Sequence, residues 1–342
     1  MRTFARTLLL SVLVIGAATS CATPPPPPPP PPAALPPPPK VGLSTQIIEL
    51  ASTYRAVMSA AGGMEPTFAS GEDVAGAVKI GASYEQAQLQ QGSIAFAAVA
   101  ALQEPTFVAS VRTFANDRIQ RELLINTLIA NPGYAATFPN SDKAAGLAIA
   151  AIDGMGAKVM VAGRAVKQSA YDIQRQPWSR ATVQNSAERL TGAKDLSTRR
   201  LLADAADVAA LRQASAGEAA MSLNGVAVPP PYSTTITNGL AIAAIAALGG
   251  ADDGSDQTRL APLLVESETA YCLNMAKLNL YQCLAVAGPH YEDIFCLGQH
   301  GLMDTGQCMI SAAGSPTPAF IAPPPPMRVA APTPQTKSKA RR

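Results

Sequence analysis

Four cysteines near one end of the chain have a spacing that defines a chemistry. Cys272, Cys283, Cys296 and Cys308 form an even set, and thiols in an oxidising compartment pair as disulfides. Neighbours along one helix cannot pair, because the eleven residues from Cys272 to Cys283 span about 16 Å of helix. That separation exceeds the reach of a disulfide. The bridges must therefore join two facing segments.

A helical hairpin that turns at residues 288–289 meets this condition. The midpoint of Cys283 and Cys296 is 289.5, and the midpoint of Cys272 and Cys308 is 290. An antiparallel hairpin therefore brings both pairs face to face. The offsets of eleven and twelve residues are about three helical turns, which keeps both bridges on one seam. We predict nested disulfides, Cys283–Cys296 inside and Cys272–Cys308 outside.

Metal binding is the competing use of these thiols. Cys296 and His300 stand at i and i+4, a spacing at which two side chains on one helix face can share a metal. The other cysteine spacings are not those of a zinc module, and an oxidising compartment favours pairing of thiols. We therefore favour disulfides and assign neither a metal site nor a cofactor.

Acid–base chemistry at a histidine would have to use His290 or His300, the only two in the chain. His290 lies near Glu292 and Asp293 at the expected turn, where carboxylates lining a cleft could act on cell-wall material. The chain contains no Gly-x-Ser-x-Gly elbow, no His-Glu-x-x-His pair and no phosphate-binding loop. We assign no catalytic residue, and an envelope enzyme centred on His290 remains the alternative.

The N-terminal residues resemble the signal of a bacterial lipoprotein precursor. Basic residues precede a short apolar run at 8–15, and small residues follow it, as in a secretory signal. The apolar run is too short to span a bilayer. The sequence at 18–21, Ala-Thr-Ser-Cys, is similar to a lipobox, with Ala18 where leucine is usual.

This resemblance implies that Cys21 receives a diacylglyceryl group and becomes the first residue of the mature protein. Ala22 follows it, whereas an aspartate at that position tends to retain such proteins at the inner membrane. The implied address is therefore the outer membrane of a Gram-negative cell, facing the periplasm. The alternative is cleavage after Ala22, which would give a soluble periplasmic protein.

Proline-rich segments flank the rest of the chain. Proline cannot join a helix interior, so the prolines from 24 to 39 predict a polyproline II spacer on the order of 50 Å long. The proline-rich segment at 313–342 ends in basic residues, and we expect it to be disordered. It is either a tether to an anionic envelope polymer or a solubilising end.

The body between these segments is mildly acidic. The chain has 26 basic and 24 acidic residues, and removal of two leader arginines and four basic tail residues leaves 20 basic residues. A body of this charge has no overall basic field, so we expect no nucleic-acid partner.

Helical periodicity fills the body. Phe107, Val111 and Phe114 recur at i, i+4 and i+7, and alanine, the best helix former, supplies much of the apolar content. No stretch alternates in the manner of a strand. We predict an all-α, alanine-rich multi-helix bundle with a C-terminal disulfide-stapled hairpin. The expected helices are 44–61, 67–80, 83–103, 106–130, 141–175, 178–191, 197–223, 234–249, 262–287 and 290–310.

The expected helix at 141–175 contains four interior glycines, each of which costs about 1 kcal/mol relative to alanine. We expect a neighbouring helix to approach closely there and offset this cost. Three charged residues favour a buried core helix over a membrane span. The glycines are Gly146, Gly154, Gly156 and Gly163, and the charged residues are Asp153, Lys158 and Arg164.

A short motif occurs twice, 39 residues apart. The sequence Glu-Pro-Thr-Phe stands at 65–68 and again at 104–107. Proline is favoured in the first turn of a helix, so each copy predicts a helix start, at Pro66 and at Pro105. The spacing raises the hypothesis of an internal duplication.

The expected organisation is a signal peptide at 1–20, a lipid anchor and spacer at 21–40, a helical domain at 41–312 with its hairpin at 262–310, and a disordered tail. We expect a non-enzymatic envelope lipoprotein with a scaffolding or interaction domain. Its partners would be the membrane, through the lipid, and cell-wall polymer or other envelope proteins. A binder of a small apolar ligand is a further alternative, and it requires a closed cavity of a few hundred Å³.

Overall fold

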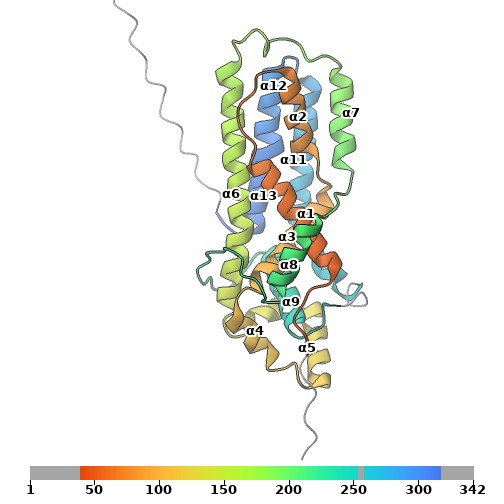
Figure 1. Ribbon diagram of the computed structural model, residues 1–342, viewed down its shortest axis with the longest axis vertical. Helices are drawn as coiled ribbons and strands as arrows, with labels where there is room; N and C mark the ends of the chain where they lie inside the picture. Colours follow the sequence, from red (N-terminus) through yellow and green to blue (C-terminus); the bar gives the residue numbers. More distant parts are fainter. Residues whose placement is uncertain (1–38, 253–257, 317–342) are drawn as a thin grey trace, which may run out of the picture. The chain divides into compact units, whose positions relative to one another are not determined.

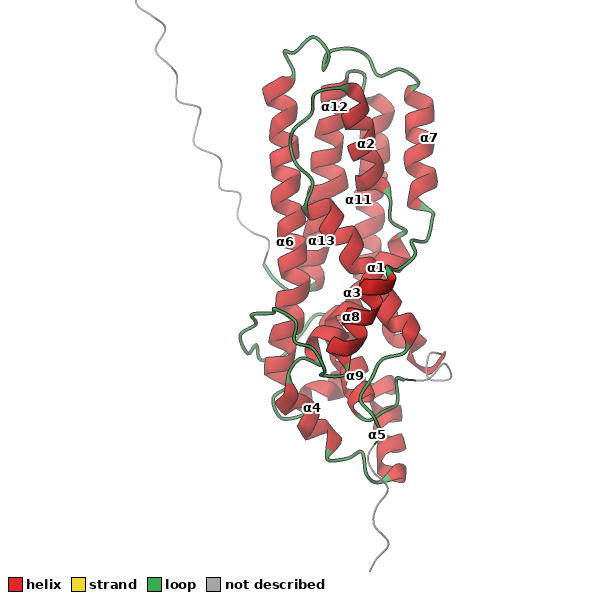
Figure 2. Cartoon of the chain, in the orientation of Figure 1, coloured by secondary structure: helices red, strands yellow, loops and turns green. Residues whose placement is uncertain are grey.

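A computed structural model describes residues 39–252 and 258–316. Within these ranges the chain is helical and contains no strand (Figure 2). One isolated β-bridge joins Thr182 and Pro289. The prediction of an all-α fold is confirmed.

The first half of the body consists of six α-helices and one 3₁₀ turn (Figure 1). Polar side chains begin several of them: Ser44 caps α1, and Ser70 forms a capping box with Asp73 at α2. The elements are α1 (Thr45–Gly62), α2 (Gly71–Ala82), α3 (Gln86–Ala101), α4 (Pro105–Arg112), α5 (Arg118–Ala130), η1 (Pro132–Thr137) and α6 (Ser141–Ile173).

The second half ends in the hairpin. Its last three elements form one continuous helical arm, in which a π-helical stretch, η3, separates two α-helices. The elements are α7 (Ser186–Ser197), α8 (Ala205–Ser215), α9 (Thr234–Ala247), η2 (Ala261–Leu264), α11 (Ser267–Val286), α12 (His290–Cys296), η3 (Leu297–Met303) and α13 (Asp304–Ala312).

Helices α3 and α9 form the centre of the core, and small residues let them approach their neighbours closely. A Cβ added at Gly92 of α3 would lie 2.6 Å from the Leu50 carbonyl oxygen of α1. A Cβ added at Gly239 of α9 would lie 2.7 Å from the Cβ of Ala97 in α3. Glycines at these two positions therefore permit the short interhelical distances.

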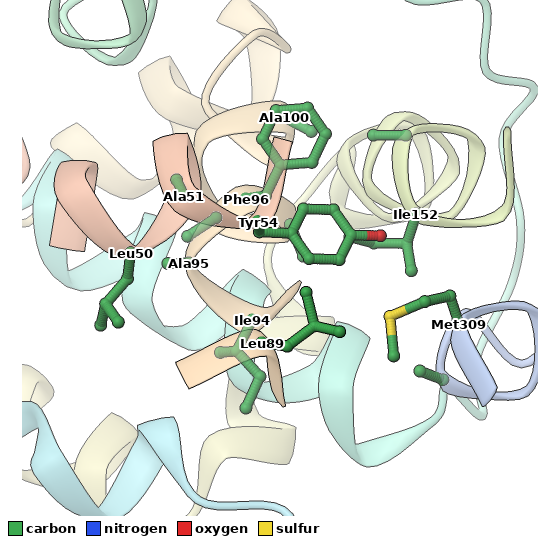
Figure 3. Close-up of a cluster of buried hydrophobic side chains, with 14 of the residues drawn as sticks. Leu50, Ala51, Tyr54, Leu89, Ile94, Ala95, Phe96, Ala100, Ile152 and Met309 are labelled. Atoms are coloured by element: carbon green, nitrogen blue, oxygen red, sulfur yellow. The ribbon is translucent and has the colours of Figure 1, made fainter. Parts of the chain in front are cut away.

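Aromatic rings fill the space between α1, α3 and α6 (Figure 3). Tyr54 is fully buried, and its ring centre lies 5.6 Å from that of Phe96. The tyrosine side chain points toward Ile152 of α6, and its hydroxyl has no hydrogen-bond partner. Burial raises the pKa of this hydroxyl.

The glycines of α6 meet the C-terminal arm at two points. A Cβ on Gly156 would lie 2.9 Å from the Gly306 carbonyl oxygen, and one on Gly163 would lie 2.9 Å from that of Gly298. These contacts confirm the expected close helix approach, and α6 runs beside α13 in Figure 1. Gly146 instead accommodates the backbone at Val226 in a loop.

The expectation of a close helix approach is wrong for the fourth glycine, Gly154. A Cβ on Gly154 would meet nothing within 4 Å. Among the single helices of the described residues, α6 is the one long and apolar enough to cross a membrane, and half of its apolar window is buried in the fold. Its packing against the arm accounts for that apolar character.

Several helix boundaries differ from those expected. The stretch 106–130 forms two helices, because Asp117 accepts the amide protons of Ile119 and Gln120 and starts α5 anew. The expected helix at 178–191 is wrong, since α7 begins only at Ser186. The expected helix at 197–223 is reduced to α8, which Asp204 caps.

The repeated motif begins a helix at only one of its two positions. Glu104 caps α4 with Pro105 in its first turn, as expected. Pro66 lies in the loop before α2, which begins at Gly71 after the Ser70 cap. The structure of the two copies therefore differs, although their four residues are identical.

Candidate functional site

Two disulfides hold the C-terminal hairpin closed. Cys283 pairs with Cys296 at a Cα–Cα distance of 5.5 Å, and Cys272 pairs with Cys308 at 5.6 Å. The nested pairing is the one predicted from the common centre of the two pairs. Both bridges join α11 to the arm formed by α12, η3 and α13.

The alternative metal ligands have other partners. The sulfur of Cys296 is bonded to Cys283, and Nδ1 of His300 lies 2.8 Å from Oδ2 of Asp304. Burial opposes ionisation of Asp304, but hydrogen bonds from His300 and Gln299 lower its pKa below the ordinary value. Across the described residues, no group of three or more His, Cys, Asp or Glu side chains is placed to hold a metal ion.

The residues around His290 fasten the hairpin turn. Asp293, 2% exposed, forms an ion pair with Arg189 of α7. Burial raises the pKa of Asp293 to about 6, although Arg189 opposes this. Glu292 accepts the Gly288 amide proton at 2.8 Å. Each carboxylate therefore has a structural partner: Arg189 for Asp293, and the Gly288 amide for Glu292.

His290 itself packs against neighbouring segments. Its ring centre lies 6.4 Å from that of Trp178, and a Cβ on Gly71 would lie 2.4 Å from the imidazole. Burial, and then the charge of Arg189, lower the pKa of His290. His290 therefore packs as part of the hairpin turn. These contacts give no evidence for the alternative of an acid–base site.

The burial of Lys277 in α11 is not expected from the sequence. This lysine lies between the two cysteines of the helix, yet it is only 2% exposed. Its Nζ donates hydrogen bonds to the carbonyl oxygens of Ala82, at 2.7 Å, and Tyr84. It also lies 3.7 Å from the centre of the Tyr84 ring. Burial lowers the pKa of Lys277 to about 7. Its hydrogen bond to Ala82 caps the C-terminal end of α2.

The outward face of α11 is apolar along almost its whole length. Tyr271 is 66% exposed and Val286 is 85% exposed, and Met275 and Leu278 lie exposed between them. With the exposed Gln282, these residues form a row at i, i+4, i+7, i+11 and i+15. We call this row the α11 stripe. Apolar rows of this kind on a soluble helix mark interaction surfaces.

Several hollows lie elsewhere on the described part of the body. One of about 610 Å³ is lined by residues of α1, α6, α8 and the segment 219–224, including Arg55 and Lys158. A second, of about 800 Å³, lies between α1 and the segment 200–208. Both open to solvent, whereas the apolar-ligand alternative requires an enclosed apolar cavity.

Glutamine side chains hold the loops around these hollows. The Gln88 amide donates to the Leu201 carbonyl and accepts from the Leu201 amide, both at 2.8 Å. Gln103 joins the Ala214 carbonyl to the Met221 amide, both at 2.7 Å. Each side chain satisfies one backbone donor and one backbone acceptor; for Gln103 the acceptor lies in the last turn of α8. Sequence reasoning missed this, since nothing in the local pattern distinguishes these glutamines from solvent-facing ones.

Gln90 belongs to the same set. With its nitrogen turned toward the Leu264 carbonyl, at 3.3 Å, its oxygen accepts from the Glu266 amide at 3.2 Å. The orientation of such an amide is assigned from its hydrogen-bonding neighbours. The glutamines at and just after α3 therefore anchor three separate loops to the core.

No family model, curated protein or solved structure matches this chain. The predicted lipidation site Cys21, the signal peptide, the spacer up to residue 38 and the tail from residue 317 lie outside the described residues.

Proposed function

We propose that this protein is a lipoprotein of the Gram-negative cell envelope, anchored through Cys21 at the outer membrane and facing the periplasm. Its helical body would serve as a scaffolding or interaction domain, held off the membrane by the proline-rich spacer. Lipidation and address rest on the resemblance of residues 18–21 to a lipobox. The two disulfides support export, because such bridges persist in oxidising compartments.

The observation that carries the interaction role is the absence of a charged outward face on α11. Within 269–286 the only charged residue, Lys277, points into the protein, while the mostly apolar α11 stripe faces out. A surface helix ordinarily carries its charged residues on the outward face. A partner that covers the stripe would remove this apolar area from water, at about 25 cal/mol per Å².

The chemistry of the stripe favours a protein partner over cell-wall polymer. It is uncharged and mostly apolar, with the phenol of Tyr271 at one end, and such surfaces are typical of protein interfaces. The basic tail is the part of the chain suited to an anionic polymer. The mildly acidic body has no overall basic field for nucleic acid.

Fractionation of a Gram-negative host tests the anchoring. The intact chain is expected in the outer-membrane fraction, whereas Cys21→Ala is expected in the soluble periplasmic extract or retained as uncleaved precursor. Cys21→Ala leaves the body and its disulfides unchanged, so it isolates the role of the lipid. If the intact chain and the variant were both soluble, the lipoprotein proposal would be wrong.

A further inference from the structure

The α11 stripe has the properties of a surface that can pack against itself. Its centre in the sequence lies at Leu278, midway between Tyr271 and Val286 to within one residue. A two-fold axis beside Leu278, between it and Asn279, would place Tyr271 opposite Val286, and Met275 opposite Gln282. Each side chain would then meet a neutral one, as an isologous interface between two identical surfaces requires.

Charge favours this pairing. Glu268 lies beyond one end of the stripe, and Lys277 is turned inward with its hydrogen bonds to Ala82 and Tyr84 made. Packing α11 on a second α11 therefore buries no ion, which removes the largest cost of forming such an interface. The helix has 20 residues, so the contact could extend over about 30 Å.

The disulfides hold the stripe in a fixed orientation. Cys272 and Cys283 tie both halves of α11 to the arm, so the helix cannot rotate to hide its apolar face. An interface that needs little ordering on association loses less free energy to conformational entropy.

We propose that the α11 stripe is a self-association surface, on which α11 of a second copy packs antiparallel across a two-fold axis beside Leu278. This inference rests on the interaction role proposed for the stripe and not on the lipid anchor. Loss of the dimer and loss of membrane anchoring are therefore separate outcomes.

Sedimentation of the full chain tests the pairing. Cys21→Ala is used as the background, so that lipid-driven aggregation does not obscure the result. A dimer is expected at micromolar concentration. Leu278→Asp would bring two carboxylates together at the axis and weaken association by about 100-fold or more.

Leu202→Asp is the matched control, because Leu202 is 95% exposed and lies outside the stripe. It should leave the dimer intact. Leu278 is already 41% exposed, so its variant should keep the helical circular dichroism and melting temperature of the parent. A monomeric parent, or a dimer that persists in folded Leu278→Asp, overturns the proposal.

A photo-crosslinker tests the register independently. p-Benzoylphenylalanine at Tyr271 should react with the partner near Val286, giving a covalent dimer whose crosslinked peptides identify both ends. A crosslink from 271 to 271 would indicate parallel packing and contradict the antiparallel arrangement. A crosslink exclusively to lipid or to another protein would show that a different occupant covers the stripe.

Discussion

The Nζ of Lys277 lies 3.7 Å from the centre of the Tyr84 ring and donates a hydrogen bond to the backbone carbonyl of the same residue. Through this contact a charged position of α11 becomes part of the core, and the outward face of the helix is left without charge. The inward turn of Lys277 therefore leaves the outward face of α11 uncharged and also gives the C-terminal end of α2 a hydrogen-bond donor.

This burial predicts an unusual dependence of stability on pH. The pKa of Lys277 falls from its ordinary value of 10.5 to about 7 on folding. Between these two values the unfolded chain binds a proton that the folded protein does not. The free energy of unfolding should therefore rise with pH from about 7 upward, by up to about 1.4 kcal/mol per pH unit.

Denaturant melts across this pH range, with Lys277→Met beside the parent, measure the effect. The variant should lack this contribution to the slope and be less stable at high pH, where the Ala82 and Tyr84 carbonyls lose their donor. Lys158→Met, at an exposed lysine of α6, should retain the parental slope. Equal slopes in all three proteins would contradict the assignment.

Two glycines in α6, two residues apart, should respond oppositely to alanine. Gly156→Ala would force a Cβ to within 2.9 Å of the Gly306 carbonyl oxygen, and the overpacking should destabilise the protein by about 1–3 kcal/mol. Gly154→Ala meets open space and should stabilise it by up to about 1 kcal/mol. Urea unfolding of the two variants checks this, and a loss of stability in both would argue against the packing described here.

Gln88 should control the segment that carries Leu201. Gln88→Leu removes both hydrogen bonds to the Leu201 backbone while keeping much of the side-chain volume, and should cost about 1–3 kcal/mol. Hydrogen exchange of the amide of Leu201 should accelerate with it. Gln120→Leu, at an exposed position of α5 outside the α11 stripe, is the control for stability. If Gln88→Leu left exchange at Leu201 unchanged, the two Gln88 hydrogen bonds would not be what holds this segment.

The covalent framework of the fold could be predicted from sequence, and much of the polar framework could not. The cysteine pairs share a centre, so their pairing follows from helix geometry alone. Helix α6 likewise follows from its period and its glycines. The expected starts of α2 and α8 are wrong, although the sequence contains an N-cap signal for each helix. Ser70 precedes Asp73, and Asp204 precedes Asp207, by the three residues typical of a cap.

The inward turn of Lys277 and the three glutamine contacts depend on which segments the fold brings together. Their partners lie far away in the sequence: Gln88 and Leu201 are 113 residues apart, and Lys277 and Ala82 are 195 apart. A lysine on a helix is ordinarily assigned to solvent, so local pattern places it on the wrong face. For the same reason the α11 stripe becomes visible only in the structure.

The intact mass of the mature protein from a Gram-negative host, alkylated with and without prior reduction, tests the central claim of an anchored and stapled body. The account predicts a chain that begins at Cys21 and carries a diacylglyceryl group. Cys272, Cys283, Cys296 and Cys308 should be alkylated only after reduction. A chain that begins after Ala22, with thiols that react before reduction, would contradict both the anchor and the disulfides.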